Sequence, residues 1–246
     1  MSNTARVIWK SAGLAVVAAM LVTAVVWGYK MQPTDAPCAS LRYTIEDRDD
    51  RLYVTEQELD LLLQSKDLYP VGKHMDVGSL HRIEETVLHH PMVRTAECYM
   101  TPRNEVRIRL TQRVPLVRVQ TAADTYLIDT DRKVMPVREA VRDSVLLVKG
   151  TVGVQLASGQ LADFAEWLDD HSYWRKRVHH VYVASPQMVY IYLKGEGPRI
   201  VMGNMRDYEK KLAKLRVFLE HGAEATKDKN YTELDLRFKG QVIGRY

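Results

Sequence analysis

The chain has 246 residues, 46% hydrophobic and 27% charged, which suits one or two folded domains and excludes a disordered or collagen-like chain. Its 35 Lys and Arg exceed its 31 Asp and Glu by four, but three of these basic residues, Arg6, Lys10 and Lys30, lie in an N-terminal stretch without acids. No basic domain therefore remains to bind nucleic acid. Two cysteines are too few for a disulfide scaffold, and their spacing does not match a zinc site.

The first predicted element is an apolar helix over residues 11–29, which contains no charged residue. As a helix it would be about 28 Å long, close to the hydrocarbon thickness of a bilayer. We expect residues 1–10 to be a cytoplasmic tail, residues 11–29 a single transmembrane helix, and the rest to lie outside the cytoplasm. A cleaved signal peptide is the alternative, although the apolar stretch is long for one and no small-residue cleavage site follows promptly.

Residues 30–40 are polar with two prolines and are predicted to be a linker. A strand is expected at Leu41–Ile45, where apolar and polar residues alternate. Thr55 and Glu58 then form a capping-box pattern, which predicts a helix starting there. A second helix is expected from Ser79 to Pro91, because proline cannot continue the ladder of hydrogen bonds.

Two further strands are predicted, at about Val93–Met100 and at Val106–Leu110, with a turn at residues 102–104 between them. The order strand, helix, helix, strand, strand predicts a compact α+β module over residues 41–113.

Residues 114–246 have a different pattern, with short runs in which apolar and polar residues alternate. Two predicted helices interrupt these runs, roughly Gly159–Asp170 and Met205–His221. This pattern predicts a second domain made of a β-sheet with packed helices. The predicted strands are Leu116–Val119, Thr125–Ile128, Val145–Val148, Val181–Val183, Val189–Leu193, Arg199–Met202 and Tyr231–Phe238.

No motif for catalysis or cofactor binding is predicted. The pairs His89-His90 and His179-His180 are adjacent residues, whose side chains diverge on a helix or a strand, so neither pair suits one metal ion. The sequence contains no nucleophile elbow, phosphate loop or HExxH motif. We expect no enzyme activity, no metal and no cofactor.

The final predicted strand has one apolar side and one charged side. Thr232, Leu234, Leu236 and Phe238 alternate with Tyr231, Glu233, Asp235, Arg237 and Lys239. A strand near the end of the chain often lies at a sheet edge, where its unpaired backbone groups can bind a partner strand. An internal strand, or a charged edge that resists aggregation, explains the pattern equally well.

In combination these features resemble the bacterial cell-division family FtsQ/DivIB. The similarity rests on the basic tail with one anchor, a POTRA-like stretch at residues 76–119, the segment TYLIDTDRKVMPV at 125–137, and YTELDLRFKGQVIGRY at 231–246. The resemblance implies a non-enzymatic scaffold of the inner membrane at the division septum, with its C-terminal domains in the periplasm. Such a scaffold helps to control septal peptidoglycan synthesis.

The resemblance also implies the partners and the binding residues. FtsB-like and FtsL-like proteins, other divisome membrane proteins and the lipid bilayer are the expected partners, and FtsB adds a strand to the C-terminal sheet edge. Arg237 would face an acidic residue of that partner, and Phe238 would pack on it. The expected contact residues are Leu236, Arg237, Phe238, Lys239, Gly240, Gln241 and Val242.

Two other functions compete with this one. A POTRA-type docking component of envelope protein secretion or assembly would share the first module, but such proteins usually carry several repeats or a long β-barrel. A membrane-anchored periplasmic hydrolase would need a clustered catalytic site, for which the sequence shows no motif.

Overall fold

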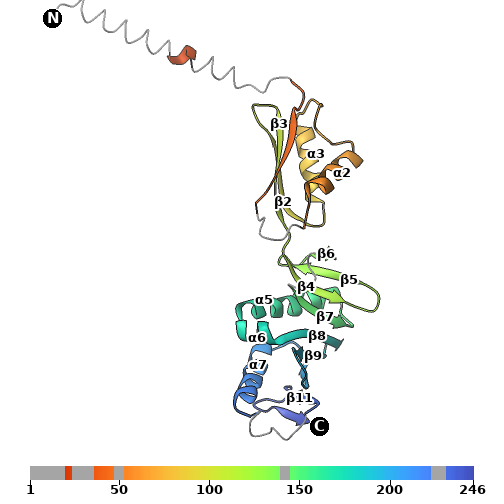
Figure 1. The fold of residues 1–246 in the computed structure, drawn as a ribbon, viewed down its shortest axis with the longest axis vertical. Helices are drawn as coiled ribbons and strands as arrows, with labels where there is room; N and C mark the ends of the chain where they lie inside the picture. The colour runs from red at the N-terminus through yellow and green to blue at the C-terminus, as the bar shows by residue number, and fades with distance from the viewer. Residues whose placement is uncertain (1–19, 24–35, 47–52, 139–144, 223–230) are drawn as a thin grey trace, which may run out of the picture. The chain divides into compact units, whose positions relative to one another are not determined.

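A computed structural model describes residues 20–23, 36–46, 53–138, 145–222 and 231–246 of the chain (Figure 1). These residues form two compact units. The first includes Val54–Thr111 and the second includes Gln112–Tyr246. Within the described ranges no helix has the length and apolar character to cross a membrane, and most of the predicted anchor lies outside them.

The first unit is a three-stranded sheet with two helices on one face (Figure 1). Strand β1 (Ser40–Ile45) pairs in parallel with the central strand β3 (Glu105–Gln112), and β2 (Val93–Met100) lies on the other side of β3. The helices are α2 (Glu56–Ser65) and α3 (Val77–Leu88). The predicted order of strands and helices is therefore confirmed.

Both helices begin at side chains that cap them. The Glu58 backbone N–H donates to Thr55 Oγ1 at 3.2 Å, and the Glu58 carboxylate accepts from the Thr55 N–H at 3.1 Å, which completes the predicted capping box. Asp76 accepts from the Ser79 N–H at 2.7 Å. Because Asp76 is the N-cap, α3 starts at Val77, two residues before the predicted start.

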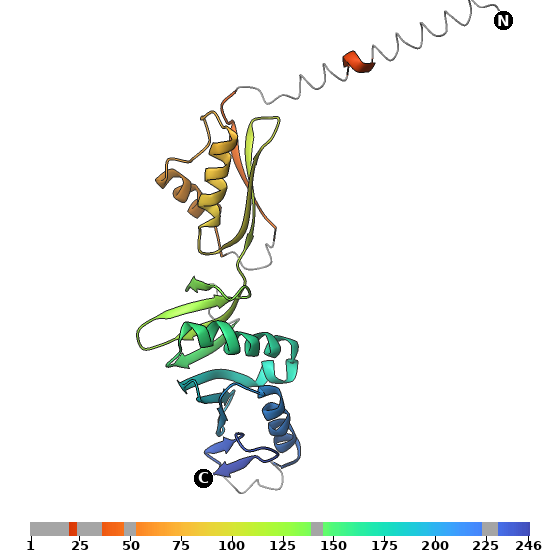
Figure 2. The ribbon, with the colours of Figure 1, turned by 180° about the vertical axis from the view of Figure 1, so that it is seen from behind.

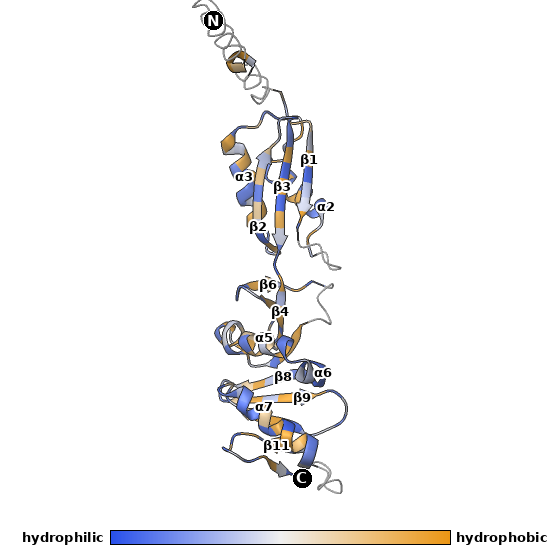
Figure 3. Cartoon of the chain, turned by 90° about the vertical axis from the view of Figure 1, so that its left-hand side faces the viewer, coloured by the Kyte–Doolittle hydropathy of each residue, from blue (hydrophilic) through white to orange (hydrophobic). Residues whose placement is uncertain are grey.

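Buried apolar residues of the helices and of β3 make the core of this unit. β3 alternates between hydrophobic and hydrophilic residues along its length (Figure 3), as a strand with one covered face requires. The fully buried residues that form this contact are Leu59, Leu63, Ile83, Val87, Val106, Ile108 and Leu110.

The second unit is built on a nine-stranded sheet in the order β12-β11-β10-β9-β8-β7-β4-β5-β6. Three neighbouring pairs, β4–β7, β7–β8 and β10–β11, are parallel, and the other pairs are antiparallel. The strands are β4 (Pro115–Gln120), β5 (Thr125–Asp129), β6 (Val134–Pro136), β7 (Leu146–Gly150), β8 (Val178–Ser185), β9 (Met188–Leu193), β10 (Arg199–Gly203), β11 (Glu233–Asp235) and β12 (Ile243–Arg245).

Helices lie against one face of this sheet (Figure 2). They are α4 (Val154–Leu156), α5 (Ala162–Asp170), α6 (Ser172–Arg177) and α7 (Tyr208–Val217), with π-helical segments at Ala157–Leu161 and Phe218–Gly222. The two predicted helices correspond to α5 and α7 with their flanking segments, whereas α4, α6 and β12 were not predicted. β6 lies in the segment 125–137, whose strand-turn-strand pattern carries part of the family resemblance. The fold is mixed α+β, as expected, with a large sheet in the second unit.

The core of the second unit lies between those helices and the sheet. Phe164 and Leu168 of α5, and Leu212 and Leu215 of α7, are buried in one cluster with strand residues. The strand residues of that cluster include Val117, Val148, Val181, Ile191, Ile200 and Leu234. Both helices therefore pack on the sheet through their apolar faces.

Candidate partner-binding edge

The last strand of the sequence prediction is much shorter in the structure, and a second short strand follows it. Only Glu233–Asp235 forms β11, so the prediction of one strand from Tyr231 to Phe238 is wrong. The chain turns after Leu236 because Asp235 Oδ1 accepts the Arg237 N–H at 3.0 Å, a side-chain turn that interrupts the strand. Gly240, at φ 72°, then lets the chain reverse and return as β12.

Strand β12 is the outermost strand at this end of the sheet. It pairs antiparallel with β11, with Glu233 opposite Arg245 and Asp235 opposite Ile243, and no other strand of the described residues lies on its outer flank. β11 is internal, because β10 pairs with its other side. The free edge therefore falls at Ile243–Arg245, and the predicted contact residues 236–242 lie in the turn that precedes it.

The turn and β12 expose several apolar side chains. Phe238 is 46% exposed, so it was wrong to place it on the core-facing side of a strand. Ile243 and Tyr246 are exposed too. The ring of Tyr246 stacks on Tyr231, with centroids 5.2 Å apart. Of the other predicted contact residues, Leu236 is buried, Val242 is partly buried, and Arg237, Lys239, Gly240 and Gln241 are exposed.

Two acidic side chains of β11 are buried, although the sequence pattern placed them on a solvated face. Glu233 is 6% exposed and Asp235 is fully buried. Glu233 pairs with Arg199 at 2.8 Å and with Arg245 at 3.2 Å, and Asp235 pairs with Arg237 at 2.6 Å. Each buried carboxylate is thus compensated by arginines from β10, the turn or β12.

The ionisation of this group follows from its contacts. Burial alone would raise the pKa of Asp235, but hydrogen bonds from the side chain and backbone of Arg237, with the charges of Arg237 and Arg245, outweigh burial and lower it. The hydrogen bonds that the Arg237 side chain donates to Asp235 also raise the pKa of Arg237. Asp235 and Arg237 are therefore both charged at neutral pH, and their pairing fastens the turn to β11.

Only a weak signal for this arrangement is present in the sequence. A glycine four residues after Leu236 is a turn signal, and it argues against a strand that continues through residue 240. β12 itself has only three residues, Ile243-Gly244-Arg245, which is too few to show an alternating pattern. Arg245 and Lys214, which hold the turn and the edge, were not among the predicted site residues.

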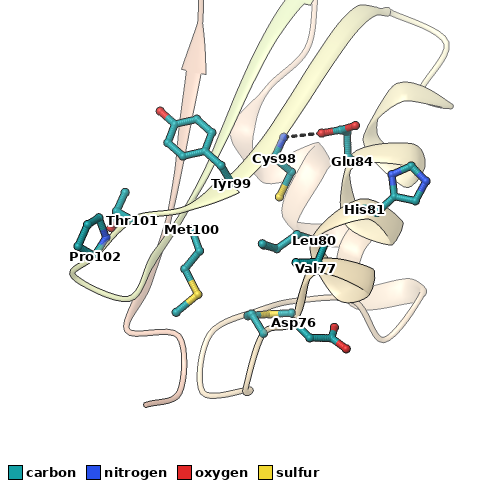
Figure 4. Close-up of a pocket in the computed structure, with 11 residues that line it drawn as sticks. Asp76, Val77, Leu80, His81, Glu84, Cys98, Tyr99, Met100, Thr101 and Pro102 are labelled. Carbon is teal, nitrogen blue, oxygen red and sulfur yellow. Dashed lines mark hydrogen bonds between the residues drawn. The ribbon is translucent and has the colours of Figure 1, made fainter. Parts of the chain in front are cut away.

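A cavity of about 680 Å³ in the first unit lies between α3 and β2 (Figure 4). The side chains of Leu80, Cys98 and Met100 lie in it, and Val77 at its rim is 84% exposed. The Glu84 carboxylate accepts the backbone N–H of Cys98 at 2.9 Å across this space. A cavity of this size and lining can accept apolar side chains from a partner.

Cys98 is a thiol in this cavity, and burial raises its pKa to about 12, with the charge of Glu84 acting in the same direction. The thiolate is the reactive form, so we expect Cys98 to alkylate more slowly than an unperturbed thiol at pH 8, by at least a hundredfold. The measurement is the rate of iodoacetamide modification by mass spectrometry, with free cysteine as reference. A rate that matches the reference would contradict the assigned environment.

The described residues bring no three His, Cys, Asp or Glu side chains together in a way that could hold a metal ion. His180 instead stacks on Tyr192 with ring centroids 4.5 Å apart, and its ring nitrogen lies 3.1 Å from that of His179. These histidines pack on the sheet surface.

The chain matches the models of two known protein families. Residues 114–245, more than half of the chain, match the family described as FtsQ/DivIB, C-terminal related. The chain belongs to the FtsQ/DivIB family. Residues 36–111 match the POTRA-like domain, and no curated protein matches the chain.

Family membership gives the general role. FtsQ/DivIB proteins are non-enzymatic scaffolds of cell division, and their partners are other proteins of the divisome. The POTRA-like match covers the cavity of the first unit, and the FtsQ/DivIB match covers the free edge at β12 in the second unit.

Proposed function

We propose that this protein is a divisome scaffold that binds an FtsB-like protein, together with its FtsL-like companion, by strand addition to β12. The observation that supports this proposal is the position of β12, which pairs with β11 on one flank only among the described strands. A partner strand would extend the sheet through backbone hydrogen bonds. Binding at this site helps to control septal peptidoglycan synthesis.

We also propose that this edge lies in the periplasm. Residues 11–29 anchor the protein in the inner membrane, with residues 1–10 in the cytoplasm and residues 30–40 as the linker. Residues 41–113 then form the POTRA domain and residues 114–246 the C-terminal domain. A partner that binds in the apolar cavity of the POTRA domain would recruit this protein to the division site.

Backbone pairing is insensitive to sequence, so side chains beside β12 provide specificity. Phe238, Ile243 and Tyr246 offer exposed apolar area next to the edge. Arg237 uses Nε and Nη2 for Asp235, and its side chain is 37% exposed, so Nη1 can meet a partner carboxylate. An aromatic and an arginine are the residue types that dominate binding energy at interfaces.

We expect Phe238→Ala to weaken binding of the FtsB-like periplasmic segment at least tenfold, a loss of about 1.4 kcal/mol. The melting temperature should stay unchanged, because Phe238 is 46% exposed and adds little to the core. Binding is measured by calorimetric titration of the full chain in detergent. Tyr182→Ala is the matched control, since Tyr182 is an aromatic residue of β8 that is 40% exposed.

Equal affinity for the Phe238→Ala and wild-type chains would refute this edge as the binding site. The alternative function, a POTRA-type docking component of envelope secretion or assembly, is separated by imaging a tagged copy in living cells. Accumulation at midcell supports the division scaffold, and uniform envelope staining supports the alternative.

A further inference from the structure

Helix α7 contributes one lysine that holds the turn between β11 and β12. Lys214 Nζ donates to the carbonyl oxygens of Leu236 and Gln241, each at 3.1 Å, and to the carbonyl of Phe238. An ammonium group has three N–H donors, and the turn supplies an acceptor for each of them. The three carbonyl dipoles therefore converge on one positive charge.

Hydrophobic burial holds only the two ends of this segment, where Leu236 is fully buried and Val242 packs against the core, partly buried. Every residue from Arg237 to Gln241 is exposed, and β12 contains no buried residue, with Ile243 36% exposed. The order of the edge thus depends on these two apolar contacts, on the stacking of Tyr246 on Tyr231, on backbone pairing with β11, on the ion pairs of Arg245, and on Lys214.

Lys214 itself comes from a firmly packed element. Its neighbours Leu212 and Leu215 are both fully buried in the core of the second unit, so the backbone of α7 is fixed at this point. A lysine on a fixed helix can hold a turn whose residues from Arg237 to Gln241 are all exposed. The three bonds connect a rigid part of the fold to its exposed edge.

We propose that Lys214 is a positioning residue for partner binding: it closes the turn at residues 236–241 and thereby fixes β12 in the register that receives the partner strand. This inference rests on the proposed function. Without Lys214 the edge would have to order at the moment of binding, and that ordering would reduce the affinity.

The first test compares Lys214→Gln with Lys210→Gln by amide hydrogen exchange of the full chain without partner. Lys210 is the matched control, because it lies on the same helix, its side chain is 84% exposed, and it pairs with Asp207. We expect protection at Ile243–Arg245 to fall at least tenfold in Lys214→Gln alone. The melting temperature should drop by no more than about 4 °C.

The second test measures affinity for the periplasmic segment of an FtsB-like protein. The affinity of Lys214→Gln should be at least tenfold lower than that of the wild type. Lys214→Arg should recover most of the lost affinity, since a guanidinium keeps the charge and several donors. Unchanged exchange in Lys214→Gln, loss of protection throughout the second unit, or unchanged affinity would each overturn the inference. A wild-type chain that binds no such segment would refute the proposed function, while the exchange comparison still decides whether Lys214 closes the turn.

Discussion

Gly150→Ala is expected to destabilise the second unit by about 3 kcal/mol, through backbone strain and overlap together. Gly150 ends β7 at φ 103°, a conformation that residues with a Cβ rarely adopt. A Cβ at this position would overlap the backbone carbonyl of Val183 on the neighbouring strand β8. Backbone atoms in the middle of a sheet cannot move aside, so the β7–β8 pairing must be distorted.

Urea denaturation followed by circular dichroism measures this loss. Gly153→Ala is the matched control, because Gly153 has a φ of −78° and a methyl group added there would meet no atom within 4 Å. That variant should stay within about 0.5 kcal/mol of the wild type. Equal stability of the two variants would show that β7 and β8 do not approach as closely as described.

Arg237→Ala is expected to lower stability by about 2–3 kcal/mol at pH 7, because it leaves the buried carboxylate of Asp235 with Arg245 alone, at 3.7 Å. This expected loss of stability is at the low end for a buried ion pair, since Arg237 is 37% exposed and solvent screens its charge. Charge reversal at Arg237 would place a second carboxylate against Asp235, so that change tests the fold and not the partner contact.

The loss should depend on pH in a defined direction. In the wild type the pKa of Asp235 is lowered on folding, so its stabilising effect is present above its unfolded value near 3.8 and is lost as pH falls below that value. In the variant, burial outweighs the remaining contacts and raises this pKa, so protonation relieves the unpaired charge. The difference in stability between the wild type and Arg237→Ala should therefore become smaller from pH 7 to pH 3.

Denaturation midpoints at pH 7, 5 and 3 measure this difference, with Lys239→Ala as the control for removing an exposed cation from the same turn. A difference that stays constant over this range would contradict the assigned role of Asp235. A large effect of Lys239→Ala would show that net charge, and not the pair, controls the stability of the edge.

Local patterns were enough to predict most of the fold. The capping box at Thr55 depends on residues within one helical turn, and it is present as predicted. The alternation in β3 likewise follows from one covered face. Such signals come from neighbours in the sequence, which the sequence shows directly.

The edge at β12 was harder to predict because several of its contacts are distant in sequence. Glu233 reads as a solvated residue, since its partner Arg199 lies more than thirty residues earlier and its partner Arg245 follows an unpredicted turn. Asp235 has a partner only two residues away, Arg237, but an alternating strand pattern does not show that the pair is partly buried. Lys214 reads as an ordinary polar residue of an amphipathic helix, and only the packing of α7 brings it to the turn. Three-residue strands also give no periodic signal.

The opposite end of the nine-stranded sheet has a different character. β6 is a three-residue strand that ends in Pro136, and proline has no backbone N–H to offer an incoming strand. A sheet with two receptive margins could take a strand at each of them. Under the proposed strand addition, Pro136 makes β6 the poorer acceptor, so the expected stoichiometry is one guest chain per sheet.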